Sequence, residues 1–148
     1  MIIAPANQEQ WNLLAQFLQE YAGVRPGLDL QMMGWITDNQ VKVVVGFNSF
    51  VGKVCQMHVA MTKGYEFSPR ELLRATFEHA FDKLKVKKVI GIVDSTNLKA
   101  MRYDAHLGFV EEHRMPGMHD DGDLVVLGMT REQCRFLEKK DAPQLLCA

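Results

Sequence analysis

The chain has 148 residues, 47% of them hydrophobic and 24% charged, which is the size and composition of one globular domain with its own core. Seventeen basic residues against eighteen acidic ones give a formal net charge of -1, so no overall positive field attracts nucleic acid or an anionic membrane. We expect one soluble domain over residues 1–148 that binds neither nucleic acid nor a membrane.

The cysteines and the N-terminus indicate the cellular compartment. Cys55, Cys134 and Cys147 are an odd number without the spacing of zinc ligands, and the first residues lack the charged start and long apolar run of a signal peptide. No apolar stretch approaches the roughly 20 residues that cross a bilayer. We therefore expect a protein of the reducing cytoplasm.

The first half of the chain predicts one helix followed by three strands. Apolar residues recur at helical spacing over residues 7–21, and Gly23 ends that pattern. Short runs with β-branched residues then alternate with turn residues. These runs predict three antiparallel strands joined by hairpins, over residues 33–37, 41–48 and 54–61.

A sharply bounded helix is predicted next. Ser68 is placed to be its N-cap, Pro69 its first helical residue, and Glu71 the partner in a capping box. The apolar stripe of this helix runs to Leu84. Val89–Val93 follows as a run that is apolar on both faces, which predicts a buried strand parallel to its neighbour.

The last third of the chain predicts one more helix and two strands. The helix ends at Gly108, a residue suited to a C-terminal cap, and Asp121-Gly122 is a hairpin signal. The expected elements are a helix over about 97–107, strands over 110–114 and 124–129, and a short helix and tail over 130–148. This order predicts an α+β domain built on one mixed sheet.

The segment from Asn97 to Phe109 resembles a pattern of the GCN5-related N-acetyltransferases (GNAT). That pattern is Asn-x-x-Ala, seven residues, then Gly-Phe, and it is matched by Asn97, Ala100, Gly108 and Phe109. The preceding strand, capped helix and strand also come in the order of that family, so the resemblance covers about residues 32–129. It implies the GNAT fold and direct transfer of acetyl from acetyl-coenzyme A to an amine in a ternary complex.

A narrower resemblance concerns three further segments. His58-Val59-Ala60, the hairpin before residues 123–129 and the closing Cys134-Arg135-Phe136-Leu137 are together similar to a bacterial and phage-encoded branch of the family. Members of the family often pair their sheets, so the resemblance allows a homodimer.

A coenzyme A site is expected at the start of the second helix. A diphosphate needs unpaired N–H groups and the positive end of a helix dipole, and Lys63 and Arg70 flank that position. In the family, the preceding strand pairs with the pantetheine amides and the motif asparagine contacts the cofactor. The resemblance thus implies acetyl-coenzyme A contacts, with no metal, at Val59, Ala60, Met61, Lys63, Phe67, Ser68, Arg70, Asn97 and Ala100.

The phosphate turn departs from the family pattern. The family's turn is rich in glycine, whereas this one keeps only Gly64, with Phe67 and Pro69 about where the last glycines would stand. Pro69 donates no N–H. This departure supports an alternative, a fold relative with impaired catalysis that serves as a binding or assembly module, for instance in a phage particle.

Three side chains are candidates for proton transfer. His58 is the best general base, because an imidazole with a pKa near 6.5 suits deprotonation of an ammonium; the alternative is a buried core histidine. Asp104 stands where the family commonly has a tyrosine that protonates the leaving thiolate, and a tyrosine occurs one residue earlier, at Tyr103. One residue is about 100° around a helix, so Tyr103 is expected to pack rather than act as the acid.

The acceptor is left open by the sequence. The segments 23–30 and 115–123 are expected to border the acceptor, and they admit a small amine, an amino acid, a protein lysine or a peptide N-terminus. The acidic run from His119 to Asp123 lacks the spacing of a calcium loop and is expected to be a turn.

Overall fold

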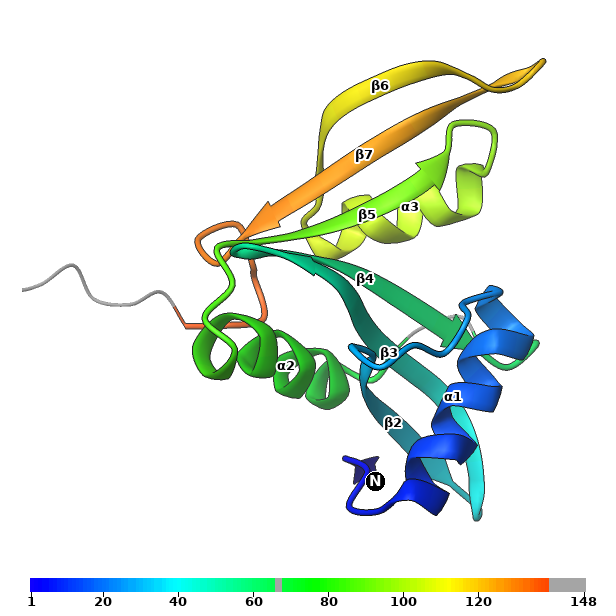
Figure 1. Cartoon of the computed structure of the whole chain (residues 1–148), viewed down its shortest axis with the longest axis vertical. Coiled ribbons are helices and arrows are strands. Elements are labelled where there is room, and N and C mark those ends of the chain that lie inside the picture. Colours follow the sequence, from blue (N-terminus) through cyan, green and yellow to red (C-terminus); the bar gives the residue numbers. More distant parts are fainter. Residues whose placement is uncertain (66–67, 139–148) are drawn as a thin grey trace, which may run out of the picture.

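The computed structural model describes residues 1–65 and 68–138, which form one seven-stranded mixed sheet with helices on both faces (Figure 1). The strands follow the order β1-β2-β3-β4-β5-β7-β6, and only β4 and β5 are parallel neighbours. The elements are β1 (Ile2–Ile3), α1 (Gln8–Ala22), β2 (Gln31–Thr37), β3 (Gln40–Val51), β4 (Val54–Met61), α2 (Arg70–Glu78), the π-helical η1 (His79–Lys83), β5 (Lys88–Asp94), α3 (Leu98–Leu107), β6 (Val110–His119) and β7 (Gly122–Thr130). The predicted α+β class with a mixed sheet is confirmed.

Helix α1 covers one face of the sheet, over β2, β3 and β4. It begins at Asn7, whose Oδ1 accepts a hydrogen bond from the Gln10 backbone N–H, and it ends at Gly23 in the left-handed conformation. Its buried residues pack closely on the strands: a Cβ at Gly46 would lie only 2.7 Å from a methyl of Leu18. Glycine at that position therefore lets the helix approach the sheet.

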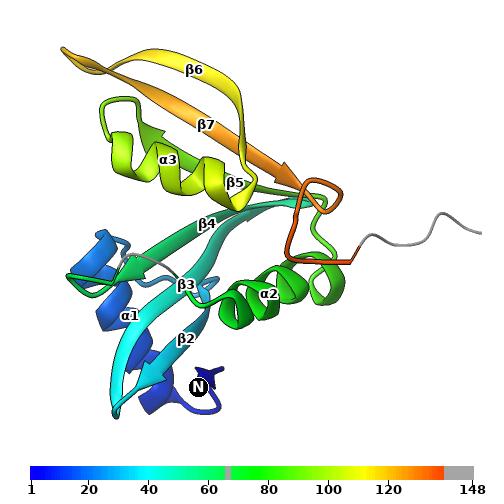
Figure 2. The same cartoon turned by 180° about the vertical axis from the view of Figure 1, so that it is seen from behind.

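Helices α2 and α3 cover the opposite face (Figure 2). Successive residues of a strand point to opposite faces, so Val43 and Val45 join the core under α2 while Val44 joins the core under α1. Phe77 of α2 and Leu107 of α3 are buried in the larger core. This arrangement brings the start of α2 close to the end of α3 on this face of the sheet.

The two parallel strands β4 and β5 are paired over only three residues each. Val54, Cys55 and Gln56 pair with Lys88, Val89 and Ile90, and beyond Gln56 the strands diverge into a V (Figure 1). The rest of β5 pairs only with β7. The sheet is therefore split on one side of this junction, which opens the edge of β4.

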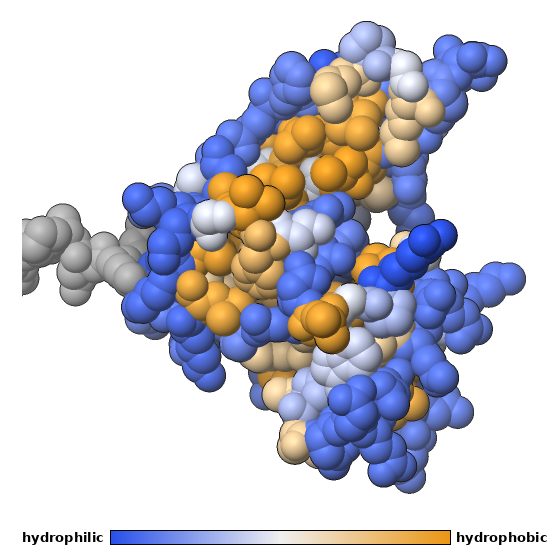
Figure 3. Space-filling view, viewed as in Figure 1, coloured by the Kyte–Doolittle hydropathy of each residue, from blue (hydrophilic) through white to orange (hydrophobic). Residues whose placement is uncertain are grey.

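The expectation that β5 is apolar and buried on both faces is wrong for one face. Val89 and Val93 are buried under α2 and α3, but Ile92 is 42% exposed because α1 does not extend over β5. Val110 and Met115 of β6 are exposed as well, and Figure 3 shows apolar side chains gathered where β5, β6 and β7 lie.

Two local predictions also fail. The carbonyl of Pro69 accepts the first hydrogen bond of α2, from the Leu73 N–H at 3.1 Å, so Pro69 and not Ser68 is the N-cap, and no side chain of the described residues caps this helix start. The short helix expected after Thr130 is replaced by turns over residues 131–137. Among the described residues, no helix is long and apolar enough to span a membrane.

Candidate active site

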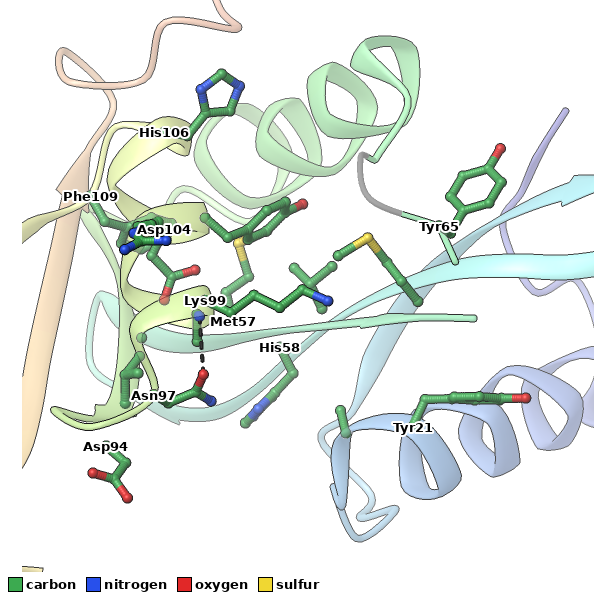
Figure 4. Close-up of a pocket in the computed structure, with 18 of the residues that line it drawn as sticks. Tyr21, Met57, His58, Tyr65, Asp94, Asn97, Lys99, Asp104, His106 and Phe109 are labelled. Atoms are coloured by element: carbon green, nitrogen blue, oxygen red, sulfur yellow. Dashed lines mark hydrogen bonds between the residues drawn. The ribbon is translucent and has the colours of Figure 1, made fainter. Parts of the chain in front are cut away.

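A pocket of about 1010 Å³ fills the gap between β4 and the pair formed by β5 and α3. Figure 4 shows Asn97, Lys99 and Asp104 pointing into it from α3 and its N-cap, with His58 across from them on β4. Tyr21, at the end of α1, lines it from the other side of the sheet. The divergence of the two parallel strands therefore creates a cavity that is reached from both faces.

The backbone of β4 presents alternate residues to this gap. The Thr62 N–H donates to the Lys42 carbonyl at 2.9 Å, so in this antiparallel ladder residues 58, 60 and 62 bond to β3. The polar backbone groups of Met57, Val59 and Met61 consequently point toward the gap, and all three residues line the pocket. Val59 and Met61 stay predicted ligand contacts, whereas Ala60 turns its backbone to β3 and does not line the pocket.

His58 lies on the same face of β4 as Ala60, the face that α1 covers, and it lines the pocket. Its Nε2 is 2.7 Å from Oδ1 of Asn48. An amide oxygen can only accept, so Nε2 carries the proton and Nδ1 carries the lone pair of the neutral ring. Burial lowers the pKa of His58 from its usual 6.5 because the charged imidazolium loses solvation. The ring is thus held neutral and oriented, with one basic nitrogen.

Asp104 and Tyr103 both line the pocket but differ in acidity. Burial raises the pKa of Asp104 to about 6, and Figure 4 shows its carboxyl group directed into the cavity. Burial raises the pKa of Tyr103 to about 12, and its hydroxyl lies 2.6 Å from that of Ser68. Tyr103 also packs against the larger core, which agrees with its expected packing role.

Asn97 has a structural role at the pocket, as the N-cap of α3. Its Oδ1 accepts a hydrogen bond from the Ala100 N–H at 3.1 Å and caps α3. Both residues line the pocket, as their places in the motif led us to expect. Because Oδ1 is engaged in the cap, a contact of Asn97 with a ligand would fall to its amide nitrogen.

A row of basic side chains borders the pocket, and of its members Lys63 alone was singled out from the sequence. Lys99, Arg102 and His106 of α3 join Lys63 of the turn after β4. Their positions, 99, 102 and 106, share one helix face, so helical spacing was a signal that could have identified them. These side chains suit an anionic ligand lying along the gap.

The start of α2 supplies further donors for an anion. The N–H groups of the first helical residues have no partner within a helix, and no side chain of residues 1–65 or 68–138 caps them. Gly64, in the turn before the helix, has a φ of 86°, a conformation that glycine adopts without strain. Lys63 lies beside it, whereas Phe67 lies outside the described residues.

Ser68 and Arg70 line a second, smaller cavity of about 180 Å³ and not the main pocket. This cavity lies between the start of α2 and the end of α3, and Tyr103 and His106 line both cavities. Apart from Ala60 and Phe67, the residues expected to contact coenzyme A are therefore divided between two adjoining cavities.

Neither the Cys55 thiol nor the acidic run from His119 to Asp123 offers a second reactive or metal site. Burial raises the pKa of Cys55 to about 12, which keeps this thiol uncharged and unreactive. His119 pairs with Gly122 across the hairpin between β6 and β7, so the acidic run is a turn. The described residues contain no cluster of three or more His, Cys, Asp or Glu side chains that could hold a metal ion.

Sequence comparisons identify no relative: no protein-family model and no curated protein matches this chain. Solved structures do match. A spermidine N-acetyltransferase chimera from Vibrio cholerae and hSSAT has 12% identity and a TM-score of 0.69, covering 93% of this chain and 99% of its own.

Two other acetyltransferases are similar. The ribosomal-protein-S18-alanine N-acetyltransferase from Escherichia coli has 16% identity and a TM-score of 0.62, covering 88% of this chain and 92% of its own. AAC(6')-Ib in complex with paromomycin and acetyl-CoA has 16% identity and a TM-score of 0.63, and the match covers 96% of this chain and 98% of AAC(6')-Ib. The chain therefore has the GNAT N-acetyltransferase fold that its Asn97-to-Phe109 segment predicted.

Proposed function

We propose that the chain is an acetyl-coenzyme A-dependent N-acetyltransferase that moves acetyl directly onto an amine in a ternary complex. The observation that carries the proposal is the parting of β4 and β5 beyond Gln56, which directs the backbone groups of Met57, Val59 and Met61 into a pocket of about 1010 Å³. Those groups are spaced for an extended amide-containing arm, and the basic side chains at the rim suit its phosphates. The donor set thus fits coenzyme A.

His58 is the proposed general base. The ammonium of an acceptor must lose a proton before its nitrogen can attack a carbonyl, and the lone pair on Nδ1 of His58 can accept that proton. A bound acetyl-coenzyme A would supply the acetyl thioester. A backbone N–H of β4 directed into the gap can polarise the thioester carbonyl, and the pocket walls hold the two reactants together.

Asp104 is the better proposed proton donor to the departing thiolate. A thiol of coenzyme A should have a pKa of about 8.5, like a cysteine. With a pKa of about 6, Asp104 gives up a proton to such a thiolate readily, although only about a tenth of it is protonated at pH 7. With a pKa of about 12, Tyr103 would hold its proton more tightly than the thiol does. We therefore assign Tyr103 to packing and hydrogen bonding.

The acceptor class is proposed from the chemistry that structurally similar proteins share. Their names specify spermidine, a protein alanine and an aminoglycoside, all of which present an amine. Asp94 lines the main pocket. Its carboxylate accepts hydrogen bonds from Thr96 and is bonded to His119, and these bonds lower the pKa of Asp94. The carboxylate therefore stays charged near an incoming ammonium.

The test is calorimetric titration with acetyl-coenzyme A followed by release of free thiol in the presence of amines. Spermidine, an aminoglycoside and a peptide with N-terminal alanine span the acceptor types. Saturable binding with amine-dependent thiol release is expected. Binding without release for any amine would favour the module with impaired catalysis, and no heat at millimolar cofactor would contradict the proposal.

A further inference from the structure

The smaller cavity has a different chemical character from the main pocket. Arg70 reaches it from the first turn of α2, His106 from the last turn of α3, and Arg135 from the segment after β7. None of the described residues that line it is a carboxylate. Three basic side chains from three separate elements thus surround a hollow of about 180 Å³ that adjoins the proposed active site.

Both arginines contact the same aromatic ring. Their guanidinium carbons lie 5.5 Å (Arg70) and 5.2 Å (Arg135) from the centre of the Phe136 ring, within the range of cation–π contacts. That ring stacks on Phe77 of α2, with centroids 5.8 Å apart and planes 13° from parallel. The Phe136 ring therefore belongs to the core, and the guanidinium groups are oriented before any ligand arrives.

The arginines lack acidic partners among the described residues. The arginines that form ion pairs there are Arg114 and Arg131, and neither Arg70 nor Arg135 is paired with a carboxylate. Arg135 instead donates to Nε2 of His106 at 3.0 Å. Two guanidinium groups on one ring repel each other, so a bound anion would relieve this repulsion as well as form charge-assisted hydrogen bonds.

Hydroxyl groups and a helix terminus add donors of the same kind. Ser68 and Tyr103, whose hydroxyls are hydrogen-bonded to each other, line this cavity, and the N-terminus of α2 begins beside it at Arg70. A phosphate monoester suits this set best, because it carries a charge of about −1.5 to −2 at pH 7 and three acceptor oxygens. Each phosphate of a diphosphate diester carries only one charge.

We propose that this cavity binds the 3′-phosphate of coenzyme A and that Arg135 determines the preference for coenzyme A over its dephosphorylated form. The inference rests on the proposed function and extends it. The diphosphate then lies at the turn containing Gly64 and the start of α2, and the adenosine reaches past α2 toward Arg135. Free inorganic phosphate has the same chemistry and is the other source of such a group.

The experiment compares coenzyme A with dephospho-coenzyme A by calorimetry in three proteins: the wild type, Arg135→Gln and Arg74→Gln. Arg74 is the matched control, because it is an exposed arginine on the same helix as Arg70 and lines neither cavity. We expect the wild type to bind coenzyme A at least about tenfold more tightly. Arg135→Gln should lose that preference and keep its affinity for dephospho-coenzyme A, while Arg74→Gln keeps both.

The outcomes separate this inference from the proposed function. Equal binding of both ligands by the wild type would overturn the inference and leave the proposed function intact. Equal weakening of both ligands by Arg135→Gln would assign the cavity to the diphosphate instead. If inorganic phosphate bound in a way that depended on Arg135, and coenzyme A and dephospho-coenzyme A bound equally, the smaller cavity would be assigned to free phosphate. If neither coenzyme A nor dephospho-coenzyme A bound, the result would count against the proposed function itself.

Folding controls complete the design. Arg135 is exposed, so Arg135→Gln should unfold at the wild-type temperature. Arg135→Lys, which keeps the charge but loses the planar fork, should retain part of the preference. A preference that is unchanged in Arg135→Lys and in Arg135→Gln would contradict the assignment.

Discussion

The hydroxyl oxygens of Ser68 and Tyr103 lie 2.6 Å apart and join the segment before α2 to the middle of α3. Tyr103 lines both cavities, so this bond forms part of the wall between them. Ser68 is only 8% exposed, and without the phenol its hydroxyl would lose this partner in a largely dry environment. The bond gives Tyr103 a structural role that does not require proton transfer.

We therefore expect Tyr103→Phe to lower the free energy of unfolding by about 1 kcal/mol while kcat/KM changes by less than about tenfold. Chemical denaturation and steady-state kinetics measure the two effects. Ser68→Ala should be similarly destabilised, and the double variant should cost less than the sum of the two. An inactive but fully stable Tyr103→Phe would instead make the phenol the acid.

His58→Ala should lower kcat/KM by roughly 10²-fold, the usual contribution of one general base. Burial disfavours the imidazolium and lowers the pKa of His58, so the acidic limb of the wild-type profile should fall below pH 6.5, with activity lost as the pH falls through it. The variant should lack this limb.

Asn48→Ala provides the control for His58, because it removes only the acceptor that orients the ring. A smaller loss of activity with the limb retained is expected. If His58→Ala keeps both full activity and the acidic limb, His58 is a core histidine and the base must be sought elsewhere.

Asp104→Asn should stabilise the protein at pH 8 but not at pH 4. Burial raises the pKa of Asp104 from 3.8 to about 6, so the folded state binds this proton more tightly than the unfolded chain, and stability falls as the pH rises from 3.8 through 6. Removing the ionisable group should recover on the order of 1–3 kcal/mol above pH 6. Denaturation curves at the two pH values measure it, and an equal effect at both would refute a titrating Asp104.

Asn97 combines a cap with a place in the pocket, so its two roles can be separated by substitution. Asn97→Ala should lose about 1 kcal/mol of stability through the missing cap and also weaken coenzyme A binding. Asn97→Asp should keep the cap but place a carboxylate at the pocket, which repels an anionic ligand. Thermal melting should show that Asn97→Asp keeps its stability, and calorimetry should show that it binds coenzyme A weakly. If both variants kept the wild-type affinity for coenzyme A, the role of Asn97 would be limited to capping.

Local features were predictable where neighbouring residues alone determine them. Gly23 ends α1 as expected, because this kind of cap depends only on a left-handed residue within one helical turn. The motif from Asn97 to Phe109 likewise predicted α3 and the fold. Ser68 shows the limit: its hydroxyl had a competing partner 35 residues away, and the bond to Tyr103 replaced the expected cap.

Contacts between distant segments decided the rest. The sequence by itself determined the order of the elements, the face of β4 on which His58 lies and the motif that predicts the fold, since all of these follow from short-range periodicity. Only the tertiary structure decided how far β4 and β5 stay paired, which backbone groups face the gap, and that Arg135 joins Arg70 across 65 positions of chain. Burial, which lowers the pKa of His58 and raises that of Asp104, likewise depends on packing between elements far apart in the chain.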